Sequence, residues 1–159
     1  MADTLFFSEE EALLNWASHI GSLCQGTELI LLSGELGAGK TTFTKGLASG
    51  MGLKDLVTSP TFTYLNIYEQ GPLRLCHYDL YRIHSPEDLE ALGFYDYLGE
   101  AVIAVEWPDK ARRALPDDYV EIDLFFDPYG RRVSVTFSGT VSLSIKQYLE
   151  SNHFETAGH

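Results

Sequence analysis

Residues 34–42 read Gly34-Glu35-Leu36-Gly37-Ala38-Gly39-Lys40-Thr41-Thr42, which matches the phosphate-binding pattern G-x-x-x-x-G-K-[ST] at every fixed position. In this pattern a strand stops, turns tightly and releases a helix whose first backbone N–H groups point at one anion. The glycines permit the turn, because a Cβ there would narrow the loop or force an unfavourable backbone angle. We therefore expect residues 35–42 to bind a nucleoside triphosphate, with Lys40 at the β- and γ-phosphates and the Thr41 hydroxyl on Mg²⁺.

The residues on either side of the loop support this interpretation. Residues 28–33 form a continuous apolar run, which is typical of a strand buried on both faces of a sheet. After the loop, Phe43, Leu47 and Met51 recur at the spacing of an amphipathic helix. Strand, loop and helix follow one another in the order that the pattern requires.

Composition limits the possible functions. The chain has 159 residues, about the size of one domain, and its 23 acidic and 11 basic side chains give a formal net charge of −12. This charge argues against a protein that binds nucleic acid unaided. Cys24 and Cys76 lie in apolar surroundings and are expected in the core, which fits a reducing compartment. No apolar run approaches the ~18 residues of a membrane span, so we expect a cytoplasmic protein that does not contact a membrane.

The rest of the chain predicts a single α/β domain over residues 1–159. The expected fold is a P-loop NTPase-like three-layer sandwich, in which helices flank a central mixed sheet that includes antiparallel hairpins. Residues 151–159 are expected to form a flexible tail. The other expected elements are a helix over 9–24, a hairpin of strands 62–68 and 73–81, a short helix from Ser85, a strand over 101–107, a hairpin of strands 120–126 and 133–137, and a helix over 142–150.

Polar hydroxyls crowd around Pro60 between two structured segments, over residues 52–61. In enzymes with a phosphate-binding loop, a threonine on such a segment can complete the Mg²⁺ shell when the γ-phosphate is present. Thr61 is the preferred candidate for this role, and Thr58 is the second. An ordinary turn with hydroxyl-to-backbone hydrogen bonds explains the pattern equally well.

An aspartate and a histidine lie within the second strand of the expected 62–81 hairpin. A period of two places His77 and Asp79 on the same face of this strand. A buried carboxylate needs a partner, so Asp79 is a candidate for the Mg²⁺ shell or for orienting the attacking water. A carboxylate paired with Arg82, Arg74 or a backbone cap is an equal alternative. His77 is interpreted as a structural histidine.

Residues 101–107 form a second apolar run, which ends in Glu106 and Trp107. Ligands of open α/β sheets bind at the carboxyl ends of the strands, so Glu106 is expected beside the phosphate loop, at Mg²⁺ or at the nucleophile. The alternative is a helix-capping glutamate. Downstream, Arg112 or Arg113 could act as an arginine finger, although a solvated basic face is the simpler interpretation.

Four segments together resemble the TsaE (YjeE) family of bacterial ATPases. They are Gly34-Glu35-Leu36-Gly37-Ala38-Gly39-Lys40-Thr41-Thr42, Ser59-Pro60-Thr61-Phe62, His77-Tyr78-Asp79-Leu80-Tyr81-Arg82 and Val105-Glu106-Trp107. The resemblance spans residues 5 to about 138. It implies a subunit that hydrolyses ATP with Mg²⁺, weakly when alone, and that supports the TsaB and TsaD proteins. Their product is the threonylcarbamoyl modification of the tRNA adenosine beside the anticodon, and tRNA is reached only through the complex.

The resemblance also implies roles for individual residues. Lys40 is the implied phosphate lysine, and Thr41 and Glu106 are the implied metal ligands. Asp79 is the implied second active-site carboxylate, and Thr61 is the implied switch threonine. Ser8 and Arg131 are implied to lie near the nucleotide base.

Two other functions use the same loop. A small-molecule kinase is the main alternative, although no acceptor site or lid is evident in the sequence. A GTP-gated switch is disfavoured, because the Asn/Thr-Lys-x-Asp segment that reads guanine in many GTPases is missing.

Overall fold

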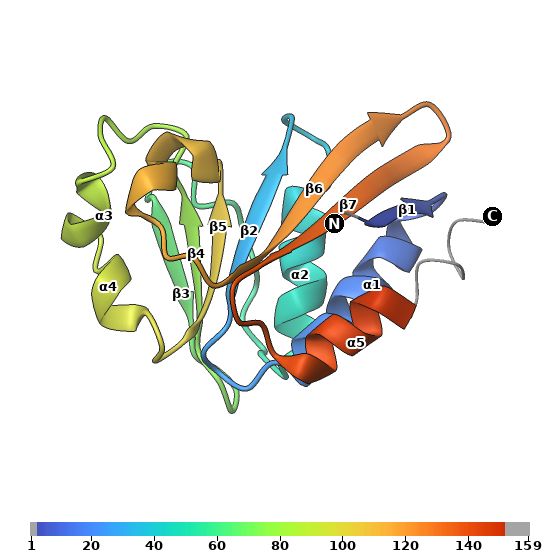
Figure 1. Cartoon of the computed structure of the whole chain (residues 1–159), viewed down its shortest axis with the longest axis horizontal. Coiled ribbons are helices and arrows are strands. Elements are labelled where there is room, and N and C mark those ends of the chain that lie inside the picture. Colours follow the sequence, from blue (N-terminus) through green and yellow to red (C-terminus); the bar gives the residue numbers. More distant parts are fainter. Residues whose placement is uncertain (1–2, 152–159) are drawn as a thin grey trace.

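The computed structural model describes residues 3–151, which form one seven-stranded mixed sheet with helices on both faces (Figure 1). The strand order is β1-β7-β6-β2-β5-β4-β3. The elements in chain order are β1 (Asp3–Phe7), α1 (Glu10–Leu23), β2 (Leu29–Gly34), α2 (Lys40–Gly50), β3 (Leu65–Tyr68), β4 (Leu75–Asp79), α3 (Asp88–Ala91), α4 (Phe94–Tyr97), β5 (Val102–Glu106), the 3₁₀ helix η1 (Pro108–Ala114), β6 (Tyr119–Asp127), β7 (Gly130–Ser138) and α5 (Leu143–Ser151).

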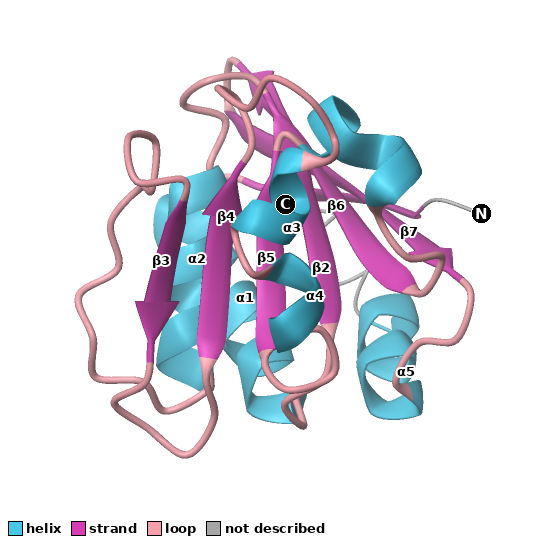
Figure 2. Cartoon of the chain, turned by 90° about the vertical axis from the view of Figure 1, so that its left-hand side faces the viewer, coloured by secondary structure: helices cyan, strands magenta, loops and turns pink. Residues whose placement is uncertain are grey.

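Two hydrophobic clusters hold the three layers together. On one face of the sheet, α1, α2 and α5 cover a core that includes Ile30, Leu32 and Ile122. On the opposite face, the short helices α3, α4 and η1 cover a smaller core that includes Leu31 and Tyr78 (Figure 2). Because side chains alternate along a strand, β2 contributes to both cores, as its uninterrupted apolar sequence predicts. The expected three-layer α/β sandwich is confirmed.

The order of the central strands determines where the candidate site lies in the fold. β2 runs parallel to β5 and to β6, and β5 runs parallel to β4. Leu32 of β2 is paired with Glu106, and Glu106 is paired in turn with Asp79. The carboxyl ends of β2, β5 and β4 therefore meet at one edge of the sheet, where the loop to α2 begins.

Most elements follow the sequence-based expectations, with three differences. The hairpins β3–β4 and β6–β7 are antiparallel as expected. The short helix expected from Ser85 begins only at Asp88, and Gly93, with φ 74°, separates it from α4. The strand β1, which pairs antiparallel with β7, was not expected. Ser151, which was expected to begin the flexible tail, is instead the last residue of α5, and residues 152–159 lie outside the described residues.

The positions of the two cysteines agree with the sequence-based expectation. Cys24 and Cys76 are buried free thiols, as expected for small core residues. Within residues 3–151, no helix combines the length and apolar character needed to cross a membrane.

Candidate functional site

The loop between β2 and α2 is a tight turn that requires glycine at two of its positions. Gly37 and Gly39 have φ angles of 80° and 115°, in the region that residues with a Cβ rarely adopt. A Cβ added at Gly39 would also lie 3.1 Å from the Leu13 side chain of α1. The positions of the glycines in the motif are thus explained by the backbone they permit.

The loop ends in the N-terminus of an 11-residue helix. The Phe43 N–H donates to the Gly39 carbonyl at 2.8 Å, so the N–H groups of Lys40, Thr41 and Thr42 have no acceptor within α2. No acidic residue occupies the first turn of α2. The loop and this helix end therefore form a cradle of donors with positive electrostatic potential, which suits an anion.

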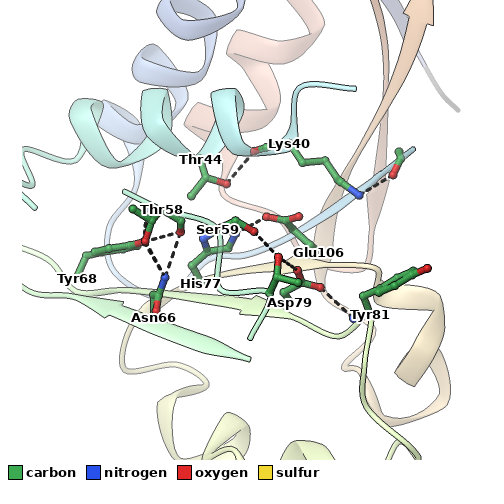
Figure 3. A network of polar contacts seen from close by, with 12 residues as sticks. Lys40, Thr44, Thr58, Ser59, Asn66, Tyr68, His77, Asp79, Tyr81 and Glu106 are labelled. Carbon is green, nitrogen blue, oxygen red and sulfur yellow. Dashed lines mark hydrogen bonds and ion pairs between the residues drawn. The ribbon is translucent and has the colours of Figure 1, made fainter. Parts of the chain in front are cut away.

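Lys40 places a buried ammonium group beside this cradle (Figure 3). Its Nζ donates to the Gly34 carbonyl at 2.6 Å and lies 3.7 Å from the centroid of the Trp107 ring. Burial lowers the pKa of the Lys40 ammonium, while the nearby Glu106 and Asp79 carboxylates act in the opposite direction. A partly desolvated cation therefore lies between the loop and two carboxylates.

Asp79 ends β4 and is almost completely buried. It accepts hydrogen bonds from the Tyr81 N–H at 2.9 Å and from the Thr61 hydroxyl at 3.3 Å. Of the structural alternatives, the backbone partner is confirmed by the Tyr81 N–H, whereas the arginine pair is wrong. Arg74 binds Glu69, and Arg82 lies over the Phe62 ring. Burial raises the pKa of Asp79, and the charge of Glu106 raises it further. The ionised form of Asp79 therefore opposes folding.

We predict that Asp79→Asn raises the melting temperature at pH 7 by about 2–4 °C. The folded state holds the Asp79 proton more tightly than the unfolded chain, so stability falls as the pH rises toward the folded-state pKa and stays reduced above it. The asparagine carries no such charge and keeps an acceptor for the Tyr81 N–H.

Thermal unfolding monitored from pH 4 to 8 measures this difference. The gain from Asp79→Asn should shrink as the pH falls toward 4, the range in which a free aspartate is protonated. An Asp117→Asn variant, at an exposed position ahead of β6, serves as the control. A stability difference that does not change with pH would contradict the stated electrostatic cause.

Thr61, rather than Thr58, reaches the site. Its hydroxyl lies 2.8 Å from that of Ser59 and donates to Asp79. Thr58 instead contacts Tyr68 and Asn66 (Figure 3). Its N–H donates to the Tyr68 hydroxyl, and its carbonyl accepts from the Tyr68 hydroxyl and from the Asn66 amide. The preference for Thr61 over Thr58 agrees with this geometry.

A cavity of about 170 Å³ joins these groups. It brings together Lys40, Thr61, Asp79 and Glu106, the residues expected to be catalytic, with Thr41 at the start of α2. The other lining residues are Leu36, Gly37, Gly39, Thr42, Ser59 and Trp107. Glu35 and Ala38 do not line it; Glu35 borders a larger neighbouring cavity, and Ala38 is buried in the core.

A second cavity, of about 180 Å³, lies on the other side of the loop. Ser8 and Arg131 line it together with Gly37, Gly39 and Thr42. The Arg131 guanidinium reaches the Gly37 carbonyl at 3.4 Å, so β7 contacts the glycine loop directly. The two residues expected near the base are therefore adjacent to the residues expected at the phosphates.

The burial of His77 agrees with its interpretation as a structural histidine, but its contact with Glu106 was not expected. Its Nε2 lies 2.6 Å from Glu106 Oε2, and both side chains are buried, with exposed fractions of 0% and 5%. The period of two along β4, which places His77 on the same face as Asp79, was the available signal. Whether that face meets Glu106 depends on the neighbouring strand, which the sequence pattern does not give.

The structure places neither Arg112 nor Arg113, the candidates for an arginine finger, at the cavity. Arg112 binds Glu121 and Asp109 through its guanidinium, and Arg113 binds Glu87 at 3.2 Å. Neither arginine lines the 170 Å³ cavity. In that cavity, Lys40 is the only Lys or Arg side chain in the lining.

The oxygen donors around the cavity fit a hard cation. Thr41 contributes a hydroxyl and Glu106 a carboxylate, with Asp79 next to it. Among residues 3–151, no three His, Cys, Asp or Glu side chains converge into a complete metal site. A few carboxylate and hydroxyl oxygens are the donors that Mg²⁺ uses in phosphate sites, where waters and phosphate oxygens supply the other ligands.

Fold and loop together define the class of this protein. A glycine loop that joins the central parallel strand β2 to the N-terminus of α2, with a carboxylate at the end of the adjacent β5, defines an α/β protein of the P-loop NTPase type. The crystal structure of YdiB from Bacillus subtilis has the same fold, with a TM-score of 0.75 and 27% sequence identity over 94% of this chain and 93% of that one.

Sequence comparison identifies the family. The family model described as "Threonylcarbamoyl adenosine biosynthesis protein TsaE" matches residues 7–133. The tRNA threonylcarbamoyladenosine biosynthesis protein TsaE of Treponema pallidum is 41% identical over 110 residues, which cover 69% of this chain and 81% of that protein. Its counterpart in Nostoc is 33% identical over 145 residues, covering 87% and 88%. The chain therefore belongs to the TsaE family.

Proposed function

We propose that this protein binds and hydrolyses Mg-ATP and thereby supports TsaB and TsaD in the threonylcarbamoyl modification of tRNA at the adenosine beside the anticodon. Family membership supports the pathway, because the relatives are named for tRNA threonylcarbamoyladenosine biosynthesis. The observation that carries the ATPase proposal is the position of Lys40, between a donor-rich glycine loop and the carboxylates of Asp79 and Glu106.

Each group around the loop has a proposed role in binding. The backbone N–H groups of residues 35–42 cradle the phosphates, and Lys40 leaves the Gly34 carbonyl to bind the β- and γ-phosphates. Ser8 and Arg131 contact the base in the cavity on the other side of the loop. The glycine loop lines both cavities, so one extended ligand can contact both.

The carboxylates and hydroxyls have proposed roles in hydrolysis. Thr41 and Glu106 hold Mg²⁺, which neutralises phosphate charge when it is bound. Asp79 and Thr61, already joined by a hydrogen bond, orient the attacking water and report the presence of the γ-phosphate. Burial of Asp79 and Lys40 strengthens every electrostatic interaction in the cavity.

The charge of the chain favours contact with tRNA through partners. A net charge of −12 repels a polyanion, so the proposed complex, rather than this subunit, binds the tRNA. The proposal places the protein in the cytoplasm with its partners.

ATP turnover measured with and without TsaB and TsaD tests the proposed function. We expect slow hydrolysis by the chain alone, and a Mg²⁺-dependent increase together with co-elution when both partners are present. No stimulation and no co-elution under any nucleotide condition would remove the coupling. Phosphate transfer to nucleosides or sugars in a parallel screen would instead identify a small-molecule kinase.

A further inference from the structure

His77 and Glu106 form a buried pair beneath the site. They come from the adjacent strands β4 and β5, and their side chains point toward each other (Figure 3). The Nε2 of His77 lies 2.6 Å from Glu106 Oε2, a short distance that is typical of a hydrogen bond to a charged acceptor. Neither side chain is held by an arginine or lysine, since no ion pair other than the mutual one involves them among the described residues.

The surroundings of the other ring nitrogen, Nδ1, indicate which nitrogen of His77 carries the hydrogen. In residues 3–151, only two buried side-chain nitrogen or oxygen atoms lack a hydrogen-bond partner, and His77 Nδ1 is one of them. A buried N–H without an acceptor costs more than an unused lone pair on the same nitrogen. The favoured tautomer therefore carries its hydrogen on Nε2 and donates it to Glu106 Oε2.

This hydrogen bond leaves Glu106 with one available oxygen. Oε2 is engaged by His77, whereas Oε1 has no hydrogen bond to any described residue and is not among the buried unpaired atoms. Oε1 is thus the atom that opens toward the 170 Å³ cavity, which Glu106 lines. His77 does not line the cavity, so it acts there only through Glu106.

We infer that His77 is a positioning residue, which fixes the Glu106 carboxylate so that Oε1 alone faces the metal and the phosphates. This inference rests on the proposed function for its catalytic consequence, but the tautomer and the hydrogen bond belong to the nucleotide-free protein. Partners of metal-binding groups commonly act in this way, and their loss lowers metal affinity or activity about 10- to 100-fold.

Two substitutions at position 77 separate positioning from packing. His77→Leu fills the buried space and removes the donor. His77→Gln keeps a donor the same number of bonds from Cα as Nε2. Cys76→Ala is the matched control, because it alters a buried side chain of the same strand that points to the opposite face of the sheet.

We expect His77→Leu to lower kcat and the affinity for Mg²⁺ about 10- to 100-fold, with little change in metal-free nucleotide affinity. His77→Gln should restore most of the loss, and Cys76→Ala should change only the melting temperature. If His77→Leu affects turnover and Mg²⁺ affinity no more than Cys76→Ala does, or if His77→Gln is as impaired as His77→Leu, the positioning role is overturned.

A nitrogen-15 NMR measurement of the His77 ring in the nucleotide-free protein does not depend on ATP hydrolysis. The expected result is a ring that carries a hydrogen on Nε2, with a resonance that shifts in Glu106→Gln. A ring protonated at Nδ1 alone overturns the inference. Because this measurement needs no turnover, a failed ATPase assay and a failed positioning role give different results.

Discussion

Replacing Lys40 with methionine should lower kcat/KM for Mg-ATP by about 10²- to 10³-fold, the size of loss found when one preorganised group that stabilises transition-state charge is removed. Lys40 is the only Lys or Arg side chain that lines the 170 Å³ cavity. Burial lowers the pKa of Lys40 because the ammonium is poorly hydrated. Such an ammonium is stabilised more by a bound phosphate than an exposed lysine is. Methionine keeps an unbranched side chain only one heavy atom shorter and removes the charge. Nucleotide titration and steady-state hydrolysis measure the loss.

Lys45→Met is the matched control for this experiment. Lys45 lies on the same helix, α2, but its side chain is exposed and absent from the lining of the cavity. Both variants should give circular dichroism spectra like that of the parent protein. Equal effects of Lys40→Met and Lys45→Met on kcat/KM would show that the buried ammonium has no part in the reaction.

Glu106→Gln should lower kcat about 10²-fold while the nucleotide dissociation constant changes less than about threefold. The glutamine keeps the size of the side chain and loses the negative charge that the proposed roles require, at Mg²⁺ or at the attacking water. The substitution also replaces the carboxylate of Glu106, which accepts the His77 hydrogen bond, with an amide. Single-turnover hydrolysis, combined with binding of a non-hydrolysable ATP analogue, separates the two quantities.

Glu100→Gln provides the control on the same segment. Glu100 is exposed and precedes β5, at the opposite end of the strand from Glu106. The control should match the parent protein in both measurements. If Glu106→Gln weakens analogue binding as much as it lowers kcat, Glu106 contributes to ground-state binding and the proposed catalytic role fails.

Local sequence was sufficient for the loop and for most elements around it. The motif predicted the glycine turn, and φ angles of 80° and 115° at Gly37 and Gly39 explain why those residues are required. The apolar run of β2 and the alternation in β6 and β7 predicted that these segments are strands. These features depend on neighbours in the chain, which a sequence pattern records directly.

The misjudged features depend on contacts between distant segments. β1 is short, and its pairing with β7 involves residues more than 120 positions apart, so no local pattern marks it. Asp79 was equally compatible with an arginine partner until the fold placed Arg74 beside Glu69 and Thr61 beside the carboxylate. Trp107, which lies under the Lys40 ammonium with a φ of 58°, gave no signal of that contact.

By itself, the sequence determined the phosphate-type loop, the α/β class and the identities of the candidate residues, because backbone preferences and side-chain periodicity act over a few neighbouring positions. Only the tertiary structure decided how these residues meet. The parallel pairing of β2, β5 and β4 brings Lys40, Glu106 and Asp79 to one cavity and directs His77 at Glu106. The physical reason is that strand order and register are fixed by burial of the two cores, a property of the whole chain that no single segment contains.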